Sequence, residues 1–266
     1  TQEDTLSWSM LYFDQCRAWN NSDDGWDFLN NVRARVDSSW SIGNGALDGD
    51  GAGMKAGLIG LNPPSKQYIF TNNLSVYNIY GFRDNCNNMS AHIDSRWYNN
   101  ITAFNDTYGF VGSIGEGLMN TNIYRNNSVF ECPVLNQWEP GGEIIHDHNS
   151  FDIIPTLNIN EGDFISIDST GLTGPRKPDG SLPDLHFLKL SKTSKLIDKG
   201  KDLGFAFNGT APDLGPWESD INANGNLYPK IKILTPYDGN KFGEPVNLQR
   251  NVEAKDSDGS IIKVEF

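Results

Sequence analysis

The feature that most constrains this chain is a repeat of 27 to 28 residues. A glycine followed by a large apolar residue occurs at Gly25, Gly53, Gly81 and Gly109, each 28 residues after the last. Paired asparagines recur every 27 residues, at Asn72-Asn73, Asn99-Asn100 and Asn126-Asn127. Two independent columns at nearly one period indicate a fold of stacked, similar units.

Each unit reads as short strands joined by turns. Runs such as Asn100-Ile101-Thr102-Ala103-Phe104 alternate polar and apolar residues, and Asn, Gly and Asp separate them, which is typical of strands. Residues 10–135 contain no long run at helical spacing. The sequence therefore predicts an all-β fold, a right-handed parallel β-helix. Each coil would lie about 4.8 Å above the last, and stacked asparagines would form hydrogen-bonded ladders.

Strand alternation divides the glycine-led columns into two sets. The inward set is apolar: Trp26, Met54, Phe82 and Phe110. The outward set carries different chemistry in each coil: Asp27, Lys55, Arg83 and Val111. An acid, an amine and a guanidinium are therefore expected on one outer face, within about 10 Å of one another.

An acidic segment precedes this face. Asp23, Asp24 and Asp27 place three carboxylates within five residues, and such acids either splay into solvent as a turn or share a cation. Ca²⁺ suits them because it takes roughly six to eight oxygen ligands. A second segment, Asp48-Gly49-Asp50-Gly51, opens like a separate calcium loop but lacks its later ligands.

Net charge and cysteine count exclude several classes of partner and fold. The 266 residues carry a net charge of -13 and an isoelectric point near 4.6, which argues against nucleic acid and anionic membranes as partners. No apolar run is long enough to span a membrane. The three cysteines indicate no disulfide framework, and Cys16 is expected to face inward beside Leu74 and Ile101 as a core residue.

Beyond residue 135 the period fades. His146 and His148 lie at i and i+2, a spacing that suits zinc or copper, but without a third ligand hydrogen-bonded loop histidines are the preferred interpretation. Residues 160–218 read as a Pro- and Gly-punctuated wrap that covers either the C-terminal turns or one side of the helix. Residues 1–228 are assigned to the β-helix domain, which lacks its N-terminal cap, and residues 229–266 to the start of a β-sandwich.

Several of these segments together resemble family nine polysaccharide lyases, the bacterial parallel β-helix pectate lyases. The likeness covers roughly residues 11–218 and is most specific at Asp23-Asp24-Gly25-Trp26-Asp27. It also rests on four other stretches: Cys16–Ser22, Gly53-Met54-Lys55, His146–Ser150 and Gly180–Pro183 with Pro212–Gly215. Residues 230–266 are similar to the start of the bacterial Ig-like modules of secreted glycan-degrading enzymes.

The resemblance implies a calcium-dependent lyase. By motif, Asp23, Asp24 and Asp27 match the family's calcium ligands and Lys55 its catalytic base, whose pKa would have to fall below the usual value of about 10.4. A further aspartate ligand of the family would fall before Thr1. The outward column, not the resemblance, suggests Arg83 as a clamp for a uronate carboxylate, with a structural ion pair as the alternative.

The leading hypothesis is a secreted or cell-surface monomer that cleaves pectate, an acidic pectin-type galacturonan, by β-elimination. One alternative is a lyase of the rhamnogalacturonan backbone. Another is a non-catalytic β-helix for carbohydrate binding or adhesion, in which the acids hold structural calcium only. Lys55 discriminates between these classes, because a binding module needs no amine beside the metal.

Overall fold

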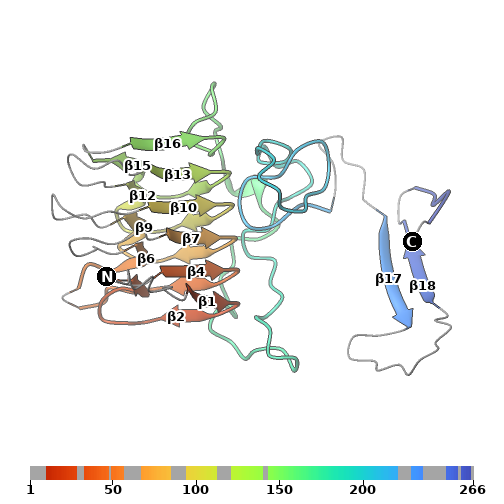
Figure 1. The fold of residues 1–266 in the computed structure, drawn as a ribbon, viewed down its shortest axis with the longest axis horizontal. Coiled ribbons are helices and arrows are strands. Elements are labelled where there is room, and N and C mark those ends of the chain that lie inside the picture. Colours follow the sequence, from red (N-terminus) through yellow and green to blue (C-terminus); the bar gives the residue numbers. More distant parts are fainter. Residues whose placement is uncertain are drawn as a thin grey trace, which may run out of the picture.

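The computed structural model describes ten segments of the chain: residues 10–28, 33–47, 49–56, 67–84, 94–112, 121–139, 143–220, 229–235, 250–256 and 259–264. Successive coils stack along one axis (Figure 1), as the repeat predicts, and their strands form three parallel sheets. The fold is therefore a parallel β-helix. Asp48 and Cys86, one of the three cysteines, lie outside the described residues.

The six-stranded sheet contains β1 (Met10–Asp14), β4 (Arg33–Asp37), β7 (Gln67–Thr71), β10 (Asp94–Tyr98), β13 (Thr121–Arg125) and β16 (Glu143–Asp147). The second sheet contains β2 (Arg17–Trp19), β5 (Trp40–Ile42), β8 (Leu74–Val76), β11 (Ile101–Ala103) and β14 (Ser128–Phe130). The third, which carries the candidate site, contains β3 (Trp26–Phe28), β6 (Ala52–Ala56), β9 (Tyr80–Asp84), β12 (Tyr108–Gly112) and β15 (Val134–Trp138).

The register of the third sheet confirms the glycine-led columns. Met54 pairs with Trp26 below and Phe82 above, and Lys55 pairs with Asp27 and Arg83 in the same way. Met54 and Phe82 pack inside the helix with rings from the first sheet. These positions need glycine because the neighbouring chain leaves no room for a side chain. A Cβ on Gly53, for example, would lie 2.0 Å from Ser75 Oγ.

Two asparagine ladders hold the coils together at their turns. In the first, each side-chain amide donates to the next carbonyl oxygen, from Asn73 to Asn100, Asn127 and Asn149, at 2.8 to 3.0 Å. The preceding residues adopt the left-handed backbone conformation, as at Asn72 (φ 57°) and Asn99 (φ 53°), which asparagine tolerates better than most residues. The paired asparagines therefore serve two needs, a turn and a ladder.

The second ladder runs through Asn21, Asn44, Asn78 and Asn105 and ends at the buried free thiol of Cys132. Cys16 does not lie where the sequence placed it. Its backbone nitrogen bonds Ser39 Oγ, so Cys16 occupies the turn column and Arg17, one residue later, aligns with Trp40 and Leu74. The prediction was off by one residue, because periodicity alone does not fix register.

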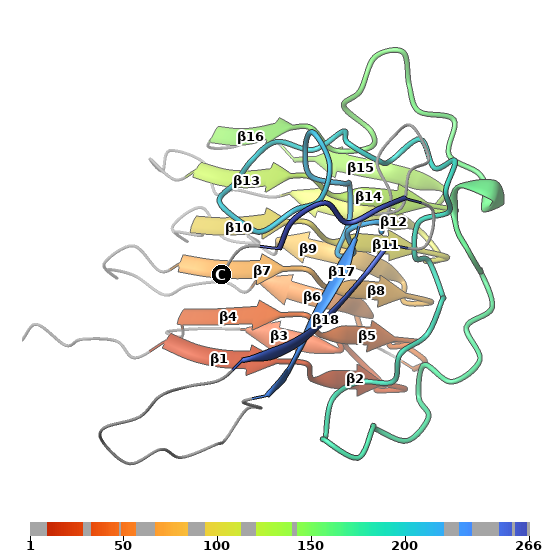
Figure 2. The same cartoon turned by 90° about the vertical axis from the view of Figure 1, so that its right-hand side faces the viewer.

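Leu74 and Ile101 accordingly face outward, against the wrap. The outer face of the second sheet packs on residues from the C-terminal segment in one buried cluster that includes Phe164, Phe187 and Leu196. Residues 151–217 run alongside the stack (Figure 2), with a single helical turn, η1 (Glu161–Asp163). This cluster explains why an outward sheet face is apolar.

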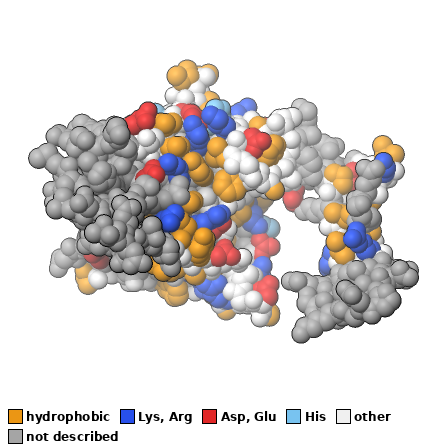
Figure 3. Space-filling view, in the orientation of Figure 1, with side chains coloured by type: hydrophobic (Ala, Val, Ile, Leu, Met, Phe, Trp, Pro, Cys, Tyr) orange, Lys and Arg blue, Asp and Glu red, His pale blue; other side chains and the backbone are white. Residues whose placement is uncertain are grey.

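The outer face of the six-stranded sheet is charged but balanced. Arg35, Arg96 and Arg125 form ion pairs with Asp37, Asp94 and Asp147 respectively. Basic and acidic side chains are interspersed over the described surface in Figure 3.

The last strands, β17 (Lys230–Thr235) and β18 (Asn251–Lys255), form an antiparallel pair. The Ig-like identity of this segment remains a prediction. Among the described residues, no helix has the length and apolar character needed to cross a membrane.

Candidate active site

The acidic segment is a turn held by the second ladder. Asn21 donates both its backbone N–H and its side-chain amide to Asn44 Oδ1, at 3.1 and 2.8 Å. Three residues on, Asp24 lies beside Gly25, where a Cβ would come within 2.2 Å of Ser41 Oγ. The chain therefore enters β3 in a fixed position, and Asp24 and Asp27 lie against Lys55 on the outer face.

Lys55 lies at the centre of a cluster of carboxylates. Its Nζ is 2.7 Å from Asp24 Oδ2, 3.1 Å from Asp50 Oδ2 and 3.6 Å from Asp27 Oδ2. The side chains of Lys55 and Asp24 are only 6% and 2% exposed. The structure thus brings together Lys55, Asp24 and Asp27 as the sequence suggested, but with the amine buried among the acids rather than beside them.

Asp23 and Asp24 also bind the backbone of the next coil. Its Oδ1 accepts the backbone N–H of Asp50 at 2.8 Å, and Asp24 Oδ1 accepts that of Ala52 at 2.6 Å. A Cβ on Gly49 would lie 2.1 Å from Asp23 Oδ1, so this turn passes directly over the carboxylate. Asp23 and Asp24 therefore anchor the turn before β6 to the coil below.

Asp50 was missed as a member of this site. The sequence treated it as part of a separate calcium loop, whereas the structure places its carboxylate against Lys55 and Arg83. One signal was available: Asp50 follows Asp23 by 27 residues, the period of the asparagine columns. A residue one period above an acidic turn lies over that turn, whatever motif it resembles locally.

Arg83 continues the outward column one coil higher. Its NH1 is 3.3 Å from Asp50 Oδ2 and its side chain is 17% exposed. The guanidinium carbon lies 4.8 Å from the ring centre of Tyr80, and this ring is stacked on Tyr108 at 5.7 Å. A cation over an aromatic face is attracted by the ring quadrupole, so Tyr80 and Asp50 hold Arg83 between them.

The pKa shifts follow from these contacts. Burial lowers the pKa of Lys55, but the hydrogen bond and charge of Asp24, with Asp50 and Asp27, outweigh burial and leave the pKa raised. The hydrogen bond from Lys55 lowers the pKa of Asp50. Burial raises the pKa of Asp27, against the attraction of Lys55. The sequence expected a lowered pKa for Lys55 because it assumed a neighbouring cation, whereas anions surround the amine.

The oxygen ligands and the net charge of this cluster suit a hard divalent cation. Asp23, Asp24, Asp27 and Asp50 bring four negative charges when ionised, and Lys55 and Arg83 bring two positive charges, which leaves the charge that one Ca²⁺ balances. The positions of the side chains differ from those of a metal site, because the ammonium of Lys55 lies among these oxygens. Among the described residues no three His, Cys, Asp or Glu side chains converge in the geometry of a metal site.

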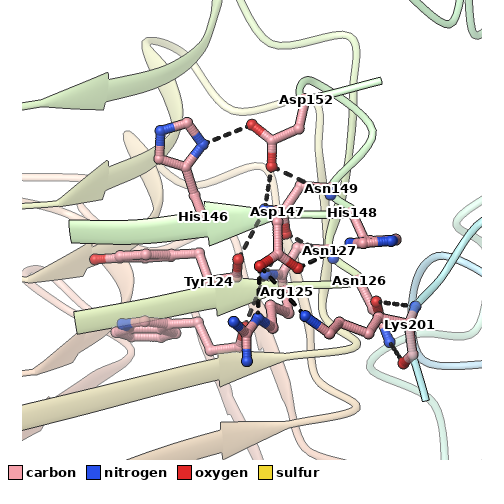
Figure 4. Close-up of polar contacts among 11 residues, drawn as sticks. Tyr124, Arg125, Asn126, Asn127, His146, Asp147, His148, Asn149, Asp152 and Lys201 are labelled. Carbon is pink, nitrogen blue, oxygen red and sulfur yellow. Dashed lines mark hydrogen bonds and ion pairs between the residues drawn. The ribbon is translucent and has the colours of Figure 1, made fainter. Parts of the chain in front are cut away.

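The two histidines do not form a site with each other. His146 Nδ1 is 2.7 Å from Asp152 Oδ1, and His148 Nδ1 is 2.8 Å from Asp147 Oδ1. The two imidazole rings lie on opposite sides of Asp147 in Figure 4. His148 is a left-handed turn residue (φ 56°), and Asp152 accepts the last amide of the first ladder, from Asn149 at 2.6 Å. Both histidines are hydrogen-bonded to aspartates at the end of the helix, but only His148 lies in the loop, because His146 belongs to β16.

Comparison with known proteins finds similarity to pectate lyases. No established family profile matches the chain. Pectate lyase L of Dickeya dadantii (strain 3937) is 30% identical over 219 residues, which cover 76% of this chain and 47% of that protein. Pectate lyase L of Dickeya chrysanthemi is 30% identical over 223 residues, covering 77% and 47%. The chain thus spans about half the length of these relatives.

Solved structures agree in fold. The crystal structure of pectate lyase Pel9A matches with a TM-score of 0.63 and 32% identity, over 78% of this chain and 50% of that one. A rhamnogalacturonan lyase matches with a TM-score of 0.56 and 27% identity, over 68% and 47%. These matches support the resemblance to family nine polysaccharide lyases and agree with the parallel β-helix.

Proposed function

We propose that this chain is part of a calcium-dependent polysaccharide lyase that cleaves pectate-like polygalacturonate by β-elimination. The observation that carries the proposal is the column on the outer face of the third sheet, where Lys55 lies between Asp27 and Arg83 in register. An amine, a guanidinium and a carboxylate cluster on one face suit an anionic polymer. The similarity to pectate lyases supports the cleavage of a uronide as the reaction at that face.

The reaction needs a base and a means of holding a carboxylate. β-Elimination from a 4-linked uronide removes the C5 proton and breaks the C4–O bond, leaving a C4–C5 double bond, and the expelled sugar oxygen takes a proton from water. Lys55, as the neutral amine, takes the C5 proton. Arg83 binds the carboxylate on that carbon, and its planar fork favours two parallel hydrogen bonds.

The acids account for the cation. Asp23, Asp24 and Asp27 are the residues that would hold Ca²⁺. When bound, Ca²⁺ would place positive charge beside the substrate carboxylate and so stabilise the negative charge that develops on proton removal. Asp24 and Asp27, together with Asp50, raise the pKa of Lys55 in the absence of a second cation, so neutralising their charge favours the neutral amine.

A second substrate has its own support, because one of the matching structures is a rhamnogalacturonan lyase. In that polymer uronides alternate with rhamnose, so the same base and clamp would serve at every second residue. We further propose that the protein acts outside the cell as a monomer, since its substrates are cell-wall polymers.

The test is the ultraviolet absorbance of the unsaturated uronide that β-elimination produces. Polygalacturonate and rhamnogalacturonan are each incubated with the protein, with calcium or with a chelator. A rise that the chelator abolishes, and that Lys55→Ala loses while still binding the polymer, supports the lyase and identifies its substrate. Normal cleavage by Lys55→Ala contradicts the mechanism. Binding without cleavage by the unaltered chain, repeated on an N-terminally longer chain, favours a binding module.

A further inference from the structure

The proposed base is almost inaccessible. The Lys55 side chain is 6% exposed, yet it has to reach a carbon of a polymer on the outer face. Of the three carboxylates around it, Asp24 is 2%, Asp27 28% and Asp50 46% exposed. Asp50 is therefore the most exposed of the three acids that contact the amine, and the one most accessible to a substrate.

One oxygen of Asp50 serves both cations. Oδ2 lies 3.1 Å from Lys55 Nζ and 3.3 Å from Arg83 NH1. If Arg83 holds a substrate carboxylate beside Lys55, that carboxylate would lie against the guanidinium where Asp50 Oδ2 now lies. The structure shows this position filled by the protein's own acid.

Asp50 is also the acid best able to leave. Asp27 projects from β3, and Asp24 is fixed through its second oxygen to Ala52. Asp50 belongs to the turn between β5 and β6, flanked by Gly49 and Gly51, and its backbone N–H bonds Asp23. The backbone can thus stay in place while the exposed side chain rotates away from the two cations.

We propose that Asp50 is a specificity-determining residue that competes with the substrate, its carboxylate occupying the uronate position between Lys55 and Arg83 until an anionic sugar displaces it. This rests on the proposed function of the same face. A protein whose binding-competent state is only partly populated binds with its affinity reduced by that fraction. If Asp50 is in place about 80 to 90% of the time, its competition weakens uronate binding about five- to tenfold.

The experiment compares the unaltered chain with Asp50→Asn, which keeps the size of the side chain and removes its charge. Trigalacturonate binding is measured by calorimetry in the presence of calcium, and KM and kcat are measured on the polymer that is cleaved. The matched control is Asp106→Asn, because Asp106 is an exposed residue two positions before β12, as Asp50 is before β6. Thermal unfolding verifies that both variants fold.

We expect Asp50→Asn to bind trigalacturonate about five- to tenfold more tightly, with a matching fall in KM, and Asp106→Asn to be unchanged. Unchanged or weaker trigalacturonate binding overturns the proposal. Calcium titration without saccharide identifies the reason: weaker calcium binding by Asp50→Asn assigns Asp50 to the cation site instead. If the unaltered chain cleaves neither polymer, the proposed function fails, but calorimetry still decides the role of Asp50.

Discussion

Replacing the buried Asp84 with asparagine should remove a large part of the pH dependence of stability. Asp84 follows Arg83 in β9 but points inside the helix, 1% exposed. Ser95 Oγ, Trp97 Nε1, Asn122 Nδ2 and the Tyr124 hydroxyl all donate to it. No described cation pairs with it, and burial raises its pKa to about 7 despite the four donors.

The size and sign of the effect follow from linkage. The pKa is raised from 3.8 to about 7, which corresponds to about 4 kcal/mol at about 1.4 kcal/mol per unit. The folded state holds the proton more tightly than the unfolded state, so this stability is fully present below about pH 4 and is lost as pH rises through about 7. The amide that replaces the carboxyl in Asp84→Asn would be neutral throughout, at a cost of about 1 to 3 kcal/mol for an amide facing donors.

Denaturant unfolding at a series of pH values between 4 and 8 measures the difference. The free energy of unfolding should fall with pH in the unaltered chain, and the gap to Asp84→Asn should change by up to about 4 kcal/mol. Asp106→Asn, at an exposed turn, should follow the unaltered curve. Parallel curves for Asp84→Asn and the unaltered chain would refute the reasoning.

Three further changes test the site and its scaffold. Lys55→Ala should lower the free energy of unfolding by about 3 kcal/mol, since it leaves the buried Asp24 carboxylate without the cation that pairs with it, and calcium should raise its melting temperature more than that of the unaltered chain. Arg83→Lys should raise KM for the cleaved polymer about tenfold with little change in kcat, because an amine lacks the planar fork; a fall in kcat alone argues against a binding role. Asn100→Ala interrupts the first ladder between Asn73 and Asn127 and should cost about 2 to 4 kcal/mol in denaturant unfolding, whereas Asn208→Ala, at a partly exposed site where it removes a bond to Ser219, should cost about 1 kcal/mol.

The stacking of coils could be predicted from the sequence, because each stacked column repeats at nearly one period. The glycine columns predicted the register of Asp27, Lys55 and Arg83 correctly, since the sheets approach too closely there for a Cβ. The register of Cys16 was wrong by one residue, because short strands between two polar turns admit either choice.

The protonation of Lys55 could not be predicted from the sequence. Motif and period placed three aspartates near Lys55, but not Asp50 against its amine, nor the depth at which Lys55 is buried. Both depend on the turn before β6, which Asp23 and Asp24 tie down through backbone hydrogen bonds. A sequence shows which acids are present, whereas the pKa of the base depends on where each oxygen points.

One distinction separates the polar columns of this fold into scaffold and site. Along the ladders the chemistry is nearly constant, since one amide donates to the next from Asn73 to Asn149. Along the outer column it changes at every coil, from Asp27 to Lys55, Arg83 and Val111. Identical amides can satisfy one another at the spacing of stacked strands, so constancy favours stability. A column that changes charge gains no such ladder, and it places different groups about 5 Å apart, which is what binding and deprotonating one sugar requires. A polar column whose chemistry changes at fixed register is therefore the place to look for function in a stacked β fold.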